Sequence, residues 1–177
     1  MAKFTHIDEK GNALMVDVGH KQVTSRMALA TGRIFMNDEC YKAVKNGQVT
    51  KGDVLGTARI AAIMAAKKTS SLIPLCHNLL ITKCTVDFLF HDETRAVEAQ
   101  CRVYCEGKTG VEMEALTGTS VALLTVYDMC KAVDKRMVIS EVHLEEKTGG
   151  KSGPFLFNEG GENRERFDYD AQRFCHR

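Results

Sequence analysis

The chain has 177 residues, of which 44% are hydrophobic and 27% charged, and these proportions are typical of one globular domain with a sizeable core. Lysine and arginine number 24 against 23 acidic residues, so the formal net charge of +1 excludes a general attraction to nucleic acid or to an anionic membrane. The first ten residues hold no apolar signal segment, and no window approaches the length of a membrane span, so we expect a cytoplasmic protein.

The first part of the chain predicts one strand and two helices. Alternating side chains over residues 22–36 favour a strand that carries Arg26 on one of its faces. Asn37 is typical of a helix N-cap, and the short helix that follows should end near Gly47. Residues 53–68 predict a core helix that is rich in alanine. Its large apolar side chains recur near helical spacing, and these are Leu55, Ile60, Ile63 and Met64.

A loop and a hairpin should follow. The polar run Thr69-Ser70-Ser71 together with Pro74 predicts a loop that leads to the mouth of the next strand. Two alternating runs over residues 80–90 and 97–105, separated by a polar turn, predict a β-hairpin.

The remaining pattern completes a fold class. Residues 111–133 predict a long helix with Gly118 as an interior weak point, and residues 137–144 predict a final strand. The order strand, helices, strand, strand, helix, strand predicts an α+β, ferredoxin-like (split βαβ) fold, with an antiparallel sheet and its helices packed on one face. We expect one domain over residues 1–153 and a flexible, polar tail over residues 154–177.

The seven cysteines lack the paired spacing of a metal or redox motif, so we interpret them as reduced and mostly buried thiols. Cys101 and Cys105 lie about 13 Å apart if they share a strand, which is beyond the reach of a disulfide. A zinc site is a weak alternative, because adjacent ligands on an extended chain point in opposite directions. Its ligands would be Cys76, His77, His20 and His143.

The long helix carries the clearest pair of charges. Asp128 and Lys131 are three residues apart and therefore share a face, although spacing alone favours an ordinary surface ion pair. Glu114 lies fourteen residues before Asp128, which places the two carboxylates about 21 Å apart along the helix. If both act on one ligand, either the ligand is long or two subunits form the site. Gly118, between them, would suit either a subunit interface or local packing.

Candidate ligand-binding residues lie outside this helix. His77 follows a loop and could stay exposed enough to bind or protonate a substrate, although an isolated histidine often has no such role. The run Gly150-Lys151-Ser152 lacks the first glycine of a phosphate-binding P-loop, and Pro154 follows where a helix should begin. A segment able to close over a polyphosphate remains, with cationic candidates Lys147, Lys151, Lys51 and Lys67.

Six motifs in order resemble the cyclic pyranopterin monophosphate synthases, the MoaC family of molybdenum-cofactor biosynthesis. They are MVDV (15–18), GDVLGTA (52–58), IPLCH (73–77), GVEMEAL (110–116), YDMCK (127–131) and KTGGKSG (147–153). The resemblance implies a ferredoxin-like subunit, dimers assembled into a hexamer, and an active site at the dimer interface. It also implies a substrate, the cyclised dihydro derivative of GTP, which a radical S-adenosylmethionine enzyme supplies. The products would be cyclic pyranopterin monophosphate and pyrophosphate, and no cofactor or metal is required.

The resemblance also assigns roles. Asp128 would be the catalytic acid and base, accompanied by Lys51 and Lys131. The substrate pocket would be lined by Leu75, Cys76, His77, Met113 and Glu114, with the cations Arg26, Lys67, Lys147 and Lys151.

One departure from the family pattern is Asn78, which stands where the family usually has proline, so this loop is less restricted. The alternative function is a ferredoxin-like ligand-binding or regulatory module without catalysis. An RNA-binding version is disfavoured, because Tyr104 is the lone aromatic near the outward positions of the hairpin.

Overall fold

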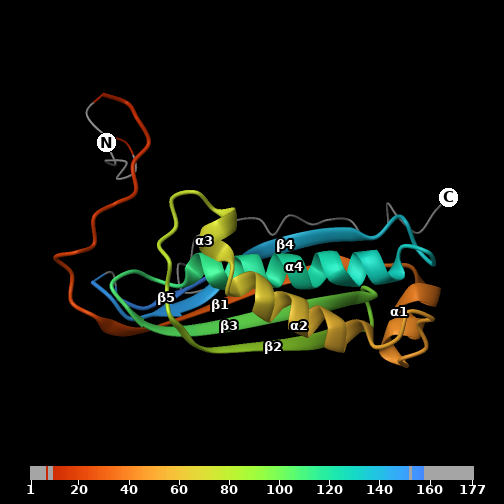
Figure 1. The fold of residues 1–177 in the computed structure, drawn as a ribbon. Helices are drawn as coiled ribbons and strands as arrows, with labels where there is room; N and C mark the ends of the chain where they lie inside the picture. The colour runs from red at the N-terminus through yellow and green to blue at the C-terminus, as the bar shows by residue number, and fades with distance from the viewer. Residues whose placement is uncertain (1–6, 8–9, 152, 158–177) are drawn as a thin grey trace.

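The structure is a computed structural model, and it describes residues 7, 10–151 and 153–157. The predicted strands and helices follow one another along the chain in the predicted order, with α3 and β5 in addition (Figure 1). The elements are β1 (Thr24–Phe35), α1 (Asp38–Lys45), α2 (Val54–Ala66), α3 (Thr69–Leu72), β2 (Ile81–His91), β3 (Ala96–Gly107), α4 (Glu112–Cys130), β4 (Val138–Thr148) and β5 (Phe155–Leu156).

The five strands form one antiparallel sheet in the order β2-β3-β1-β4-β5. The helices α2 and α4 lie side by side on one face of this sheet (Figure 1). The first four strands with these two helices make the split βαβ arrangement, which confirms the predicted ferredoxin-like fold class. Within the described residues no helix has both the length and the apolarity to cross a membrane.

The N-cap residues of α1 and α2 accept hydrogen bonds from backbone amides in the first turn of each helix. The side chain of Asn37 accepts a hydrogen bond from the backbone amide of Cys40 at 2.8 Å, which caps α1. Asp53 caps α2 in the same way, because its carboxylate accepts from the amide of Gly56 at 2.8 Å. Helix α2 ends at Ala66, so Lys67 forms its C-cap.

Small side chains allow α4 to pack closely on α2 and the sheet. A Cβ atom built on Gly118 would lie 2.6 Å from the Cys101 sulfur and 3.3 Å from the carbonyl oxygen of Ala62. The hydroxyl of Thr119 donates to the carbonyl of Ala30 on β1 at 3.2 Å. Gly118 therefore serves packing within the chain, which answers the question that its sequence position left open.

The predicted core helix is present, but its large apolar side chains do not all face the core. Leu55 and Ile63 pack against the core, whereas Ile60 and Met64 do not. Ile60 is 62% exposed and Met64 is 52% exposed, and on α4 the side chain of Leu124 is 56% exposed. The buried positions are mostly small, because two helices that pack on each other and on a sheet leave little room between them. They are Ala58, Ala62, Ala65 and Ala66 on α2, with Ala115, Gly118 and Ala122 on α4.

Four further details of the secondary structure differ from the prediction. Thr69–Leu72 forms the short helix α3 where a loop was expected. Helix α4 ends at Cys130, and strand β4 continues to Thr148. The two residues of β5 fall in the range predicted as a tail and pair with β4, while residues 158–177 lie outside the described residues.

Candidate active site

A carboxylate between two lysines lies at the C-terminal end of α4. The ammonium of Lys131 donates to Oδ1 of Asp128 at 2.6 Å, and the Lys51 nitrogen lies 3.9 Å from Oδ2. Lys51 also donates to the backbone oxygen of Asp128 at 3.0 Å. The hydrogen bond from Lys131, and then the charge of Lys51, hold the pKa of Asp128 below its usual value, while Asp128 raises the pKa of Lys131. The group is therefore ionised and open to solvent.

Backbone turns and buried thiols place these three side chains. Lys51 lies in the loop between α1 and α2, where the amide of Gly52 donates to the carbonyl of Val49 at 2.9 Å and Gly52 adopts a positive φ of 95°. The buried thiols of Cys40 on α1 and Cys130 on α4 share a hydrogen bond. The end of α4 is thereby fixed against α1, next to the loop that carries Lys51.

A second group of candidates surrounds the N-terminal end of α4. Glu114 is 4% exposed, and burial raises the pKa of its carboxyl group. The thiol of Cys76 lies close enough for this carboxylate to raise the thiol pKa, although burial of Cys76 is the larger cause. The preceding residue, Leu75, and the following one, His77, are placed at the same end by this contact. Met113, next to Glu114 on the helix, is 37% exposed.

The hydrogen bond of His77 shows which of its two ring nitrogens carries a proton. Its Nε2 atom lies 2.9 Å from the carbonyl oxygen of Val16, and a carbonyl can only accept. Nε2 therefore carries a proton, and in the neutral ring Nδ1 remains an acceptor.

Cationic side chains from β1, α2 and β4 lie at this same end. Arg26 donates from Nε to the carbonyl of Gly107 at 2.9 Å, and a Cβ atom on Gly150 would lie 2.4 Å from its guanidinium. The loop that follows Gly150 carries Lys151. Lys147 on β4 contacts the carboxylate of Glu112 at 3.0 Å. Lys67 ends α2, which runs antiparallel to α4 and so finishes beside the start of that helix (Figure 1).

The twelve predicted site residues thus form two groups at opposite ends of one helix. Asp128, Lys51 and Lys131 lie at one end, and the nine predicted substrate ligands lie at the other. Helix α4 is unbroken between Glu114 and Asp128, so its rise separates these two carboxylates by about 21 Å. A single chain therefore presents two half-sites.

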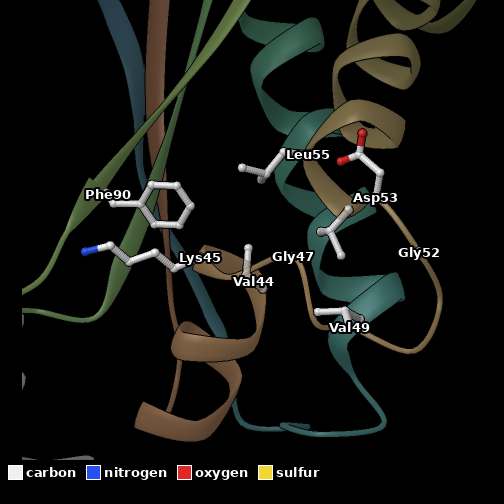
Figure 2. Close-up of a pocket in the computed structure, with 9 residues that line it drawn as sticks. Val44, Lys45, Gly47, Val49, Gly52, Asp53, Leu55 and Phe90 are labelled. Carbon is white, nitrogen blue, oxygen red and sulfur yellow. The ribbon is translucent and has the colours of Figure 1, made fainter.

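One well-defined pocket lies elsewhere. Its cavity volume is about 350 Å³, and it opens between α1, the start of α2 and β2 (Figure 2). Asp53 lines it but is engaged in capping α2, and none of the twelve predicted residues is among its lining residues. These are Val44, Lys45, Gly47, Val49, Gly52, Asp53, Val54, Leu55 and Phe90. The predicted site residues therefore lie outside this pocket.

Sequence reasoning missed two members of the second group. Glu112 pairs with Lys147, and the buried thiol of Cys105 lies near Glu114 and Arg26. Glu112 and Lys147 lie 35 residues apart in the chain, so no local signal in the sequence could have found this pair. Among the residues described here, no three His, Cys, Asp or Glu side chains are arranged to hold a metal ion.

Comparisons with known proteins agree on one family. A model described as the MoaC family matches residues 15–150. The chain is 58% identical over 154 residues to a cyclic pyranopterin monophosphate synthase from Clostridium botulinum, with 87% of this chain and 97% of the relative covered. It is 55% identical over 159 residues to the synthase of that name from Heliobacterium modesticaldum (90% and 100% covered). The relative of the same name from Campylobacter jejuni is 53% identical over 154 residues (87% and 98% covered).

Proposed function

The chain belongs to the MoaC family, and from this we propose that it is a cyclic pyranopterin monophosphate synthase of molybdenum-cofactor biosynthesis. Its substrate is the cyclised dihydro derivative of GTP (3′,8-cyclo-7,8-dihydro-GTP), and its products are cyclic pyranopterin monophosphate and pyrophosphate. The reaction places the enzyme among the phosphorus-oxygen lyases. The observation that carries the proposal is that the family match over residues 15–150 contains eleven of the twelve predicted site residues, all except Lys151.

The two half-sites act together across a subunit interface. In a two-fold symmetric dimer, the end of α4 with Asp128 from one subunit meets the end with Glu114 from the other. Symmetry then makes two identical sites per dimer. This arrangement removes the difficulty that about 21 Å of helix separates the two carboxylates within one chain. Three such dimers form the proposed hexamer.

The catalytic half-site supplies the proton transfers. Opening the saturated five-membered ring and closing the pterin require a base and an acid near the reacting atoms. Asp128 is ionised in the free chain because Lys131 and Lys51 hold its pKa low. When the substrate phosphates take hydrogen bonds from these lysines, the carboxylate loses part of that stabilisation and becomes a stronger base.

The cationic side chains stabilise the phosphate chemistry. A ribose hydroxyl attacks the α-phosphate while the bond to pyrophosphate breaks, so negative charge develops on the leaving group. Lysine and arginine side chains in a confined site stabilise such charge. Arg26, Lys67, Lys147 and Lys151 form this group in the substrate-binding half-site.

The base of the nucleotide would meet Glu114 and His77. Burial raises the pKa of Glu114, so its carboxyl group holds a proton more readily and can donate a hydrogen bond to a ring nitrogen or oxygen. In its neutral form His77 offers Nδ1 as an acceptor, because its Nε2 proton is bonded to the carbonyl of Val16. The cytoplasm, where GTP is available, is the proposed location, and a radical S-adenosylmethionine enzyme is the proposed supplier of the substrate.

The proposal is tested by supplying the purified protein with the cyclised GTP intermediate. We expect pterin product and pyrophosphate to appear in equal amounts, because one phosphate bond breaks for each pterin formed. A folded chain that binds the intermediate but releases neither product would instead support a ligand-binding module without catalysis.

A further inference from the structure

Two thiols from neighbouring strands face each other beneath α4. In the register of β2 and β3, Cys84 pairs with Val103 and Val86 pairs with Cys101, so the two cysteines are diagonal neighbours on the same face. Their sulfur atoms lie 3.9 Å apart. The two sulfur atoms are therefore in contact, and neither cysteine is among the predicted site residues.

The surroundings of the two sulfurs differ. Cys101 is fully buried, and the backbone of Gly118 on α4 packs directly against its sulfur. Cys84 is half-buried, and the ammonium of Lys67 lies near it. The hydrogen bond with Cys101, and then the charge of Lys67, lower the pKa of the Cys84 thiol, and the same hydrogen bond raises the pKa of Cys101. Cys84 is therefore the thiol of the pair that loses its proton more readily.

We propose that Cys84 and Cys101 are a redox-active thiol pair that reacts with a hydroperoxide and closes into a disulfide between β2 and β3. This inference goes beyond the synthase function and does not depend on it.

Both steps of the reaction balance. The Cys84 thiolate attacks the peroxide, an S–O bond forms, the O–O bond breaks, and sulfur gives two electrons to the departing oxygen. The Cys101 thiol then attacks the sulfenic acid, which releases water and leaves the disulfide. To form a bond of about 2.05 Å, the sulfurs approach each other by about 1.9 Å from their 3.9 Å separation. A dithiol reductant reverses the change.

Other cysteines of the chain serve as internal comparisons. Cys76 is also half-buried, but burial and the Glu114 carboxylate raise its pKa, so its thiolate is scarce. Cys40 and Cys130 form a second thiol pair, yet both are fully buried and closed to an oxidant in solution. Oxidation by a small hydroperoxide should therefore begin at Cys84 and leave these three cysteines reduced.

The test is peptide mapping of the full chain after limited treatment with hydrogen peroxide. Trypsin cuts after Lys83, Arg95 and Arg102, so Cys84 and Cys101 fall on the separate peptides 84–95 and 96–102. We expect these two peptides to be joined, with the loss of two hydrogens, and to separate after reduction. If Cys84 stays reduced under conditions that oxidise Cys76, or if it is joined to any other cysteine, the proposal is overturned.

Single-residue variants distinguish the role of Cys84, which attacks the peroxide, from that of Cys101, which closes the disulfide. In Cys101→Ser we expect a sulfenic acid to accumulate at Cys84, where dimedone traps it, and in Cys84→Ser we expect Cys101 to stay reduced. Lys67→Gln should slow alkylation of Cys84 by iodoacetamide several-fold and leave Cys76 unchanged. Oxidation of Cys101 in Cys84→Ser at the wild-type rate would contradict the assignment. The mapping of the unmodified chain decides the question even if one variant fails to fold.

Discussion

The shared active site predicts that two inactive variants restore each other. Glu114→Ala damages only the half-site at the start of α4, and Asp128→Asn damages only the half-site at its end. In a mixed dimer, one of the two sites receives both damaged halves, and the other receives both intact halves. Asp128→Asn alone should lose at least about 100-fold in turnover, because general acid-base groups contribute at least that factor. Glu114→Ala alone should be much slower than wild type, because the bound nucleotide loses its hydrogen bond to the buried carboxyl group.

The size of the recovery follows from counting sites. Random assembly of equal amounts of the two variants gives about half mixed dimers, and each mixed dimer holds one intact site of two. The mixture should therefore reach about a quarter of the wild-type turnover, far above either variant alone. The effect requires that the two half-sites come from different chains, since about 21 Å of helix separates them within one chain.

The assay uses co-expressed variants with two different affinity tags, so that purification in tandem retains only assemblies that contain both chains. The matched control combines Asp128→Asn with Lys131→Ala. Both residues belong to the same half-site, and their side chains are in contact at 2.6 Å, so no dimer of this pair contains an intact site. Recovery in the control, or no recovery in proven mixtures of the first pair, would refute the shared site.

Three other predictions concern stability. Gly118→Ala should lower the free energy of unfolding by up to about 2 kcal/mol in a urea titration, because overpacking costs about 1–3 kcal/mol and better helix propensity returns about 1. Adding Cys101→Ala removes the sulfur that the new methyl group meets. The double variant should therefore lose less free energy of unfolding than the two single variants lose together, and additive losses would contradict the packing. Burial raises the pKa of Glu114, so the folded state holds this proton more tightly than the unfolded chain, and the resulting stability is lost as pH rises through the folded pKa. Glu114→Gln should therefore gain stability relative to wild type as pH rises from its ordinary value of 4.5, and a gain that does not change with pH would contradict this. Asp134→Ala should cost about 2 kcal/mol in thermal unfolding, because the backbone amide of Asn37 loses its acceptor at 2.8 Å, whereas Asp134→Asn, which keeps an oxygen there, should cost less.

The elements that sequence predicted well are those with local signals. Alternation of apolar residues marks both strands of the hairpin, and the N-cap Asn37 marks the start of α1. Helix α3 has no such signal, because serine and threonine favour loops. It forms because Thr69 is buried and its hydroxyl donates to the carbonyls of Ala65 and Ala66 at the end of α2. These hydrogen bonds are local, but the burial of Thr69 depends on tertiary packing, which no short window of sequence contains.

The prediction of which helix residues are buried failed for a related reason. Hydrophobicity alone assigns Ile60 and Met64 to the core, but the space between α2, α4 and the sheet admits mainly alanine and glycine. Where a helix packs against another element, that element limits the size of the side chains between them. A pattern within one helix cannot reveal it.

The candidate site also contains one contact that a local pattern predicts and others that no local pattern predicts. The contact between Asp128 and Lys131 follows from a spacing of three on a helix, and the structure confirms it. Lys51 reaches Asp128 from 77 residues away, so only the family resemblance could place it there. The ion pair of Glu112 with Lys147, 35 residues apart, was missed for want of any local signal.

The most direct test of the account is turnover of the cyclised GTP intermediate by wild type, Asp128→Asn and the control Asp87→Asn. Asp87 is an exposed carboxylate on β2, away from both half-sites, so its amide variant matches the change of charge. We predict that wild type and Asp87→Asn form pterin and pyrophosphate at similar rates and that Asp128→Asn forms neither at a comparable rate. Turnover by Asp128→Asn at the wild-type rate would contradict the role of Asp128, and no turnover by the folded wild type would contradict the synthase function.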